Sequence, residues 1–251
     1  MKKNTLGIFG LFILIFVITA VMNPEFLNAY NIHNLIKWSS LYAVMSIGVA
    51  FVIITGGIDL SIGSVVGLVA VVLAFMLKVK GLNPAVAIAT TLGLSVLIGL
   101  IHGLLVTKVK LQPFVVTLCG LLIYRSLARW IGGDHSGLGP IPTKEDAGHA
   151  NLDSINQLDS VLSGKLALTE SFSLPTPLIF TLVIAIIAAL ILNRTIWGRY
   201  LFALGNNEDG ARYSGINTDA LKIAAYVICS LLAGIAGVLF AFEVGAVQPA
   251  S

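Results

Sequence analysis

Long apolar runs separated by short polar breaks dominate the chain. Seven runs are long enough, or nearly so, to cross about 30 Å of hydrocarbon. They cover roughly residues 5–22, 39–55, 62–77, 84–106, 113–132, 177–192 and 221–244. Because a backbone in lipid must satisfy its own hydrogen bonds, such segments form helices. Pro84, Pro113 and Pro177 each open a run, where a helix tolerates proline. The pattern predicts an all-α, polytopic transmembrane helical bundle with about seven spans.

Composition excludes an ordinary soluble domain. Hydrophobic residues make up 57% of the 251 residues and Asp, Glu, Lys and Arg only 11%, against about 25% charged residues in soluble domains. The net charge of +3 comes without a basic patch and interleaved aromatic residues, so we expect no nucleic-acid partner. Cys119 and Cys229 lie inside apolar runs and are interpreted as buried hydrophobic residues, not as a disulfide.

The first apolar run superficially resembles a signal peptide, because it follows Met1-Lys2-Lys3. However, its apolar stretch, residues 6–22, is longer than the usual ~7–15 residues, and no A-x-A cleavage site follows it. We therefore interpret it as a retained first span.

Two longer polar stretches predict the orientation of the bundle. Residues 133–176 hold six acidic and two basic residues, whereas residues 193–219 carry three arginines. By the positive-inside rule, the second stretch faces the cytoplasm and the first lies outside. Alternation then places the N-terminus, with its two lysines, inside. Lys78 and Lys80 fall on the outer side and oppose this orientation, so the charge bias is modest.

Motifs of enzymes are not found in the sequence. A phosphate-binding loop is not formed at Gly164-Lys165, because Leu166 follows where Ser or Thr is required. Zinc-ligand spacings and a nucleophile elbow are also missing. His102 is the one histidine inside an apolar run, where a polar contact to a neighbouring helix is its simplest role. We expect no catalytic, metal or cofactor site, and any ATP that drives this protein is hydrolysed by a separate subunit.

The sequence GGIDLSIGS, residues 56–64, joins two apolar runs with almost no polar loop. It is either a tight turn or a broken helix near membrane depth. Gly56 and Gly57 permit unusual backbone angles, and Asp59 or Ser61 can cap the following helix. A charge at the bilayer centre costs at least ~2.5–3.5 kcal/mol, so Asp59 should face protein or water. Two roles stay open for Gly56, Gly57, Asp59 and Ser61: a packing turn, or part of a translocation pathway or its gate.

Three further charged residues lie in or near the spans. Arg125 and Arg129 are one turn apart on one helix face, from which they are expected to snorkel to the outer headgroups. Glu243 ends the last span and is either a solvated terminus or part of the pathway.

Small residues recur every four positions in two predicted helices. One stripe comprises Ser95, Gly99 and Gly103, and the other comprises Ala233, Gly237, Ala241 and Gly245. Such stripes allow close approach of helix backbones in a membrane. They predict a tight bundle or a dimer face.

Residues 198–216, GRYLFALGNNEDGARYSGI, lie in the predicted cytoplasmic stretch. Asn207 can cap a short helix from Glu208 to Tyr213, in which Glu208 and Asp209 suit the helix dipole. Gly215 then suits the C-terminal cap. This helix is a candidate docking element for a cytoplasmic partner, and an ordinary solvated loop is the alternative.

Three segments resemble the permease subunits of bacterial ABC importers for sugars, the branch that handles ribose, xylose and autoinducer-2. They are GGIDLSIGS (56–64), QPFVVTLCGLLIYRSLARWIGG (112–133) and residues 198–251, in matching order and spacing. The resemblance implies a permease of the bacterial inner membrane with three kinds of protein partner: cytoplasmic ATP-binding subunits, a second permease subunit and a periplasmic solute-binding protein. It also implies that residues 193–220 form a coupling loop to the ATPase. The coupling residues would be Asn207, Glu208, Asp209, Gly210, Ala211, Arg212 and Gly215.

The resemblance implies a single transmembrane permease domain over residues 1–251. Members of the family continue past the position of Ser251, so we expect the chain to be C-terminally incomplete. Two other functions are considered. One is an ion-driven secondary transporter that relays protons through Asp59 and Glu243, and the other is a membrane scaffold without transport.

Overall fold

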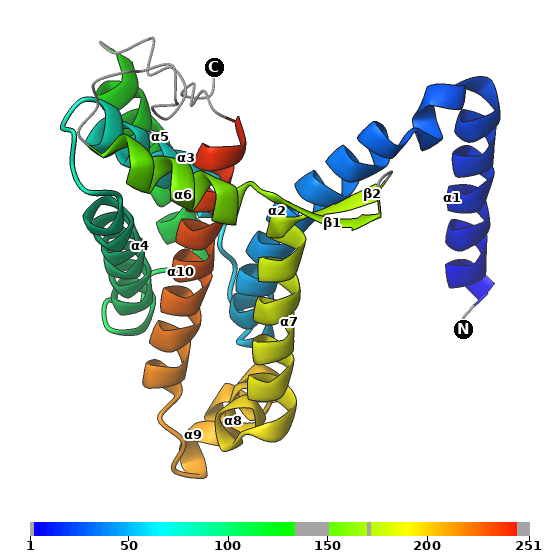
Figure 1. Cartoon of the computed structure of the whole chain (residues 1–251). Coiled ribbons are helices and arrows are strands. Elements are labelled where there is room, and N and C mark those ends of the chain that lie inside the picture. Colours follow the sequence, from blue (N-terminus) through cyan, green and yellow to red (C-terminus); the bar gives the residue numbers. More distant parts are fainter. Residues whose placement is uncertain (1–2, 134–150, 170–171, 245–251) are drawn as a thin grey trace.

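The computed structural model describes residues 3–133, 151–169 and 172–244, and these residues form a bundle of long helices (Figure 1). The long apolar helices, in chain order, are α1 (Lys3–Met22), α2 (Ala29–Ile54), α3 (Ile62–Lys78), α4 (Pro84–Thr107), α5 (Pro113–Gly133), α7 (Thr176–Arg194) and α10 (Thr218–Val244). Shorter elements connect them: the 3₁₀ turn η1 (Pro24–Leu27), α6 (Leu152–Leu162), the strands β1 (Lys165–Thr169) and β2 (Phe172–Pro175), α8 (Ile196–Asn206) and α9 (Glu208–Tyr213).

Each predicted apolar run is a helix. Five of these helices (α2, α4, α5, α7 and α10) are long and apolar enough to cross a membrane, whereas α3 and the apolar part of α1, Gly7–Met22, are shorter. The polytopic helical bundle is therefore confirmed. The start of α2 was predicted wrongly at residue 39, because the side chain of Asn28 accepts the Tyr30 amide and begins the helix at Ala29.

Helix α10 is the central helix and packs against α2, α3 and α4. Both predicted stripes of small residues make these contacts. A Cβ atom added to Gly99 of α4 would lie 2.6 Å from the Val227 Cα atom of α10, and one added to Gly237 would lie 2.9 Å from the Val69 side chain of α3. The described part of the stripes therefore serves packing within the bundle. Gly245 lies outside the described residues.

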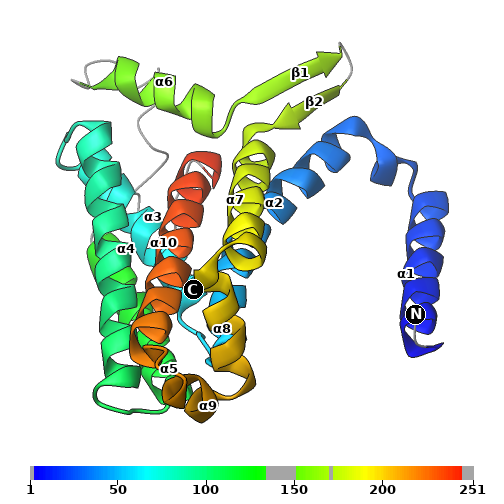
Figure 2. The same cartoon turned by 90° about the horizontal axis from the view of Figure 1, so that it is seen from below.

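The bundle has two different ends. Helix α6 and the antiparallel β1–β2 hairpin lie across one end, and α8 and α9 lie at the other (Figures 1 and 2). The Asn151 side chain donates to the Gly81 carbonyl at the first end, and Lys108 pairs with Asp219 at the second. The α3–α4 and α4–α5 connections thus lie at opposite ends, as the predicted alternation requires. The hairpin adds two strands that the all-α prediction did not include.

Helix α1 stands apart from the other long helices in both views (Figures 1 and 2). Its Phe16 ring meets the Phe26 ring of η1 edge-on, with centroids 5.3 Å apart. Apolar side chains from Ile8 to Met22 are exposed around its circumference. Such a helix suits a lipid environment, consistent with its interpretation as a retained span.

Candidate functional site

The connection between α2 and α3, residues 55–61, runs through the bundle as non-helical chain. The Tyr226 hydroxyl donates to the Ile58 carbonyl at 3.2 Å, and the Cys229 thiol lies 3.5 Å from the Asp59 carboxylate. Tyr226 is about 12 Å along α10 from its first residue, at 1.5 Å per residue. The connection is therefore a helix break inside the bundle and not a tight surface turn. Non-helical backbone at this depth is tolerated where protein surrounds it.

Two glycines begin the connection for different reasons. Gly56 has φ of +78°, in the left-handed region that disfavours side chains. Gly57 has no room for one, because an added Cβ would lie 2.9 Å from the Tyr226 hydroxyl and 3.0 Å from a Val52 methyl group. Together they end α2 and turn the chain back along α10.

Asp59 and Ser61 are buried in the second half of the connection. Asp59 is 7% exposed, and one of its carboxylate oxygens accepts both the Ser61 amide, at 2.8 Å, and the Ser61 hydroxyl, at 2.7 Å. The expectation that Asp59 faces protein or water is met by protein. Of the two predicted caps, Ser61 takes the N-cap position of α3, but its hydroxyl is bound to Asp59 and makes no capping hydrogen bond to the helix.

Buried polar side chains of three helices lie beside the connection. His102 of α4 is 1% exposed, and its Nε2 atom lies 2.9 Å from the Tyr124 hydroxyl of α5. Its ring also meets the Tyr226 ring edge-on at 6.4 Å. The predicted polar contact of His102 is confirmed. Sequence reasoning missed Tyr124 and Tyr226, although a tyrosine inside an apolar run needs a hydrogen-bond partner.

The stretch predicted to be cytoplasmic contains the predicted short helix, α9, with the predicted bounds. The Asn207 side chain accepts the Gly210 amide at 2.9 Å, and Gly215 has φ of +83° just after the helix. The capping predictions for both residues are confirmed. An additional helix, α8, was not predicted. It begins at the cap Thr195 and places Gly205 so close to the Ile54 carbonyl that no side chain would fit between them.

Ion pairs bind α9 to the bundle. Glu208 pairs with Lys222 of α10 at 2.6 Å and with Arg212 at 3.1 Å. Asp219 in turn pairs with Lys108 at the end of α4 at 2.7 Å. Ala211 is buried, whereas Asp209, Gly210 and Tyr213 face outward, with Tyr213 91% exposed. The predicted coupling residues thus divide into an anchoring side and a free side.

One cavity, here called the inner cavity, brings the two predicted sites together. It has a volume of about 250 Å³. Its lining includes Thr55, Gly56 and Gly57 from the connection, Asn207 and Glu208 from α9, and Lys222 and Tyr226 from α10. Asp59 and Ser61 are not part of this lining. The start of the connection and the start of α9 therefore share one hollow at the α9 end of the bundle.

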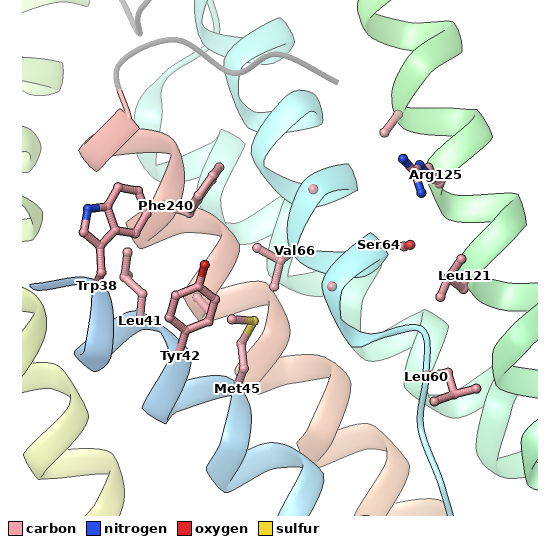
Figure 3. Close-up of a pocket in the computed structure, with 14 residues that line it drawn as sticks. Trp38, Leu41, Tyr42, Met45, Leu60, Ser64, Val66, Leu121, Arg125 and Phe240 are labelled. Carbon is pink, nitrogen blue, oxygen red and sulfur yellow. The ribbon is translucent and has the colours of Figure 1, made fainter. Parts of the chain in front are cut away.

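The other charged residues of the spans have separate positions. Arg125 lines a different hollow, here called the outer cavity, between α2, α3, α5 and α10 (Figure 3). Glu243 pairs with Lys37 of α2 at 2.9 Å, and its side chain is 5% exposed. The interpretation of Glu243 as a solvated terminus is therefore wrong. Within the described residues, no three His, Cys, Asp or Glu side chains gather as metal ligands would.

Comparison with known proteins identifies relatives over nearly the whole chain. Residues 31–251 match the family described as the permease component of the branched-chain amino acid transport system. The ribose import permease of Escherichia coli K12 is 31% identical over 94% of this chain and 69% of its own length. The D-allose transport permease of the same strain is 31% identical over 96% and 69%. The autoinducer 2 import permease of E. coli O9:H4 is 29% identical over 93% and 62%. No solved structure matches the chain.

Proposed function

Because the chain belongs to the family of permease components of branched-chain amino acid transport systems, we propose that it is the membrane-spanning permease subunit of an ATP-binding cassette importer of the bacterial inner membrane. Its cargo is a monosaccharide or a similar small polar solute, which the names of the ribose, D-allose and autoinducer 2 permeases support. Cytoplasmic ATP-binding subunits, a second permease subunit and a periplasmic solute-binding protein complete the importer. ATP is bound and hydrolysed by the partner, and this chain carries no cofactor.

The observation that carries this proposal is the position of α9. A coupling element must be rigid, must present a free face to the ATPase and must be attached to the moving helices. Helix α9 has the exposed residues Asp209 and Tyr213 on one side and the Glu208–Lys222 ion pair on the other. A push on its free face would pass to α10 and to the inner cavity, where the α2–α3 connection begins.

In this mechanism, ATP binding and hydrolysis shift the equilibrium between outward-open and inward-open arrangements of the bundle. The α2–α3 connection is suited to absorb such a shift, because it lacks the hydrogen-bond ladder of a continuous helix. Gly56, Gly57, Asp59 and Ser61 would then act as a gate region, with Asp59 and Ser61 holding the start of α3 in place.

The free face of α9 provides the test. We expect the double substitution Asp209→Lys with Tyr213→Ala to abolish co-purification of the ATP-binding subunit and ATP-driven uptake, while membrane insertion is unchanged. Loss of a tyrosine anchor alone costs about 2 kcal/mol, or roughly 30-fold in affinity. The matched control is Asp153→Lys, which reverses an exposed acidic residue on α6 at the opposite end. Wild-type ATPase binding and uptake in the double variant would refute the coupling role of α9.

The rival function, an ion-driven transporter, is less well supported. Its two candidate proton carriers are not adjacent, because Asp59 lies beside Cys229 and about 21 Å along α10 separates Cys229 from Glu243. Collapsing the proton gradient while cellular ATP is maintained distinguishes the two functions. Uptake that continues supports the importer, and uptake that stops supports the rival.

A further inference from the structure

The outer cavity has the size of a small-molecule site. Its volume is about 420 Å³, within the range of roughly 300–1,000 Å³ usual for ligand pockets. It lies towards the hairpin end of the bundle, with α2 and α5 on either side of α3 (Figure 3). Leu60 of the α2–α3 connection lines it near Leu121 of α5 (Figure 3). The connection therefore reaches the outer cavity with Leu60 and the inner cavity with Gly56 and Gly57.

Part of the cavity wall is the bare backbone of α3. A Cβ atom added to Gly63 or to Gly67 would find no atom within 4 Å. One turn further along the same face, Val71 is only 1% exposed, so the open strip stops there. A helix packed along α3 would need small residues over several turns. The open strip on α3 is therefore only about one turn long, which suits a compact ligand better than a packed second helix.

The walls combine aromatic rings with hydrogen-bond donors. Trp38, Tyr42 and Phe240 supply rings, and Arg125 and Ser64 supply a guanidinium and a hydroxyl (Figure 3). Arg125 lies about 12 Å along α5 from its last residue. A charged side chain at such depth faces the bundle interior or a water-filled cavity and commonly marks a substrate pathway.

We propose that the outer cavity is a monosaccharide-binding site within the permease itself, which receives the sugar before it passes the α2–α3 connection. This rests on the proposed function. A monosaccharide presents hydroxyl groups and apolar C–H faces on one small ring. The Arg125 guanidinium and the Ser64 hydroxyl hydrogen-bond the hydroxyls, and the rings of Trp38 and Tyr42 pack on the C–H face. Leu60 separates the bound sugar from the inner cavity until the connection moves.

Protection from chemical labelling tests occupancy directly. Cys119 is exposed, contrary to its interpretation as a buried residue, whereas Cys229 is buried. A Ser64→Cys variant is therefore made in a Cys119→Ser background, where Cys229 is the other thiol. The complex of permease and ATP-binding subunits is reacted with a small maleimide, with and without ribose or D-allose at millimolar concentration. We expect the sugar that the wild type imports to slow labelling at least about fivefold, and Arg125→Gln to remove that protection. The matched control is Gly93→Cys, at an open, exposed glycine of α4 that does not line the cavity.

Filling the cavity tests its role in transport. We expect Gly67→Leu to lower the maximal rate of uptake at least about tenfold, because the added side chain occupies the sugar's position. Gly93→Leu adds the same side chain to a helical glycine outside the cavity and should leave the rate unchanged. Both variants should retain the ATP-binding subunit and the melting temperature of the wild type, which excludes a folding defect.

Each of the following outcomes would overturn the proposal. Unprotected Ser64→Cys together with normal uptake by Gly67→Leu would remove the cavity from the sugar's path. If added phospholipid protects the Ser64→Cys thiol and sugar does not, the cavity binds a lipid. If two Ser64→Cys copies form a disulfide with each other, the cavity faces a second permease subunit. If the wild type imports no pentose or hexose, the proposed function itself fails. Wild-type uptake with an unprotected cavity would refute this site alone.

Discussion

Gly57 is enclosed by α2 and α10, and the contacts around it explain why the α2–α3 connection has its observed path. Its missing side chain allows the Tyr226 hydroxyl to reach the Ile58 carbonyl. This hydrogen bond, together with the contact between Cys229 and Asp59, joins the connection to the central helix. Gly57 therefore contributes to the fold because the absence of a side chain leaves space for the Tyr226 hydroxyl.

The substitution Gly57→Ala should destabilise the protein by about 1–3 kcal/mol, the usual cost of overpacking. Its Cβ would lie 2.9 Å from the Tyr226 hydroxyl and would displace it. Because Tyr226→Phe removes that oxygen, Gly57→Ala should cost less in a Tyr226→Phe background, as a double-mutant cycle would show. The readout is the melting temperature of the purified protein in detergent. Gly63→Ala, at an open position, is the control, and equal costs in both backgrounds would contradict the contact.

Asp59 shows how far residue-level prediction reaches. Its cost at membrane depth indicated that it must face protein or water, and protein is what the structure provides. The partner could not be derived, because Cys229 comes from a helix about 170 positions later in the chain. The role of Asp59 in a gate stays a prediction.

At the scale of elements, the ion pairs of α9 attach it to α10. Glu208 holds α9 on Lys222, and Arg212 reaches both Glu208 and Asp219. Exposed ion pairs stabilise folding by no more than about 1 kcal/mol each. Together they hold a six-residue helix against α10, which the proposed coupling role requires.

The attachment of α9 to α10 can be tested by reversing the charge of Lys222 alone and then the charges of both Glu208 and Lys222. Lys222→Glu places two carboxylates together, so the attraction between α9 and α10 becomes a repulsion. We expect uptake to fall about tenfold while ATPase activity persists, since the helix still docks but no longer moves α10. Glu208→Lys combined with Lys222→Glu restores opposite charges between α9 and α10 but sets a second cation beside Arg212, so it should recover part of the uptake. Lys110→Glu, an equal charge reversal at the same end of the bundle, is the control. If the double variant recovers no uptake, the Glu208–Lys222 ion pair does not transmit motion from α9 to α10.

Elements differed in how well their sequences predicted them. The bounds of α9 followed from Asn207 and Gly215, because local capping determines a short helix. Helix α8 was missed because it is too short to span a membrane and its apolar residues are divided between a buried and an exposed side. The outer cavity was out of reach, since its walls come from four helices whose contacts depend on the whole fold.

At the scale of the whole molecule, the proposed function assigns the two ends of the bundle to opposite sides of the membrane. The end with α6 and the hairpin would face the periplasm, and the end with α8 and α9 would face the ATPase (Figure 2). The structure fixes which connections share an end, because Asn151 binds Gly81 and Lys108 binds Asp219. The distribution of charges along the sequence was a weaker guide to this arrangement, because Lys78 and Lys80 lie at the end predicted to be outside. The absolute orientation still rests on the positive-inside rule.

Labelling from the two sides of the membrane tests that orientation. Asp153→Cys and Tyr213→Cys place single thiols on exposed positions at opposite ends, in a Cys119→Ser background where Cys229 is buried. We expect a membrane-impermeant maleimide to label Asp153→Cys in intact spheroplasts and Tyr213→Cys only in inverted vesicles. Each variant serves as the control for the other. Since an ATPase docks only from the cytoplasm, labelling of Tyr213→Cys in spheroplasts would reverse the bundle and leave α9 without its proposed partner.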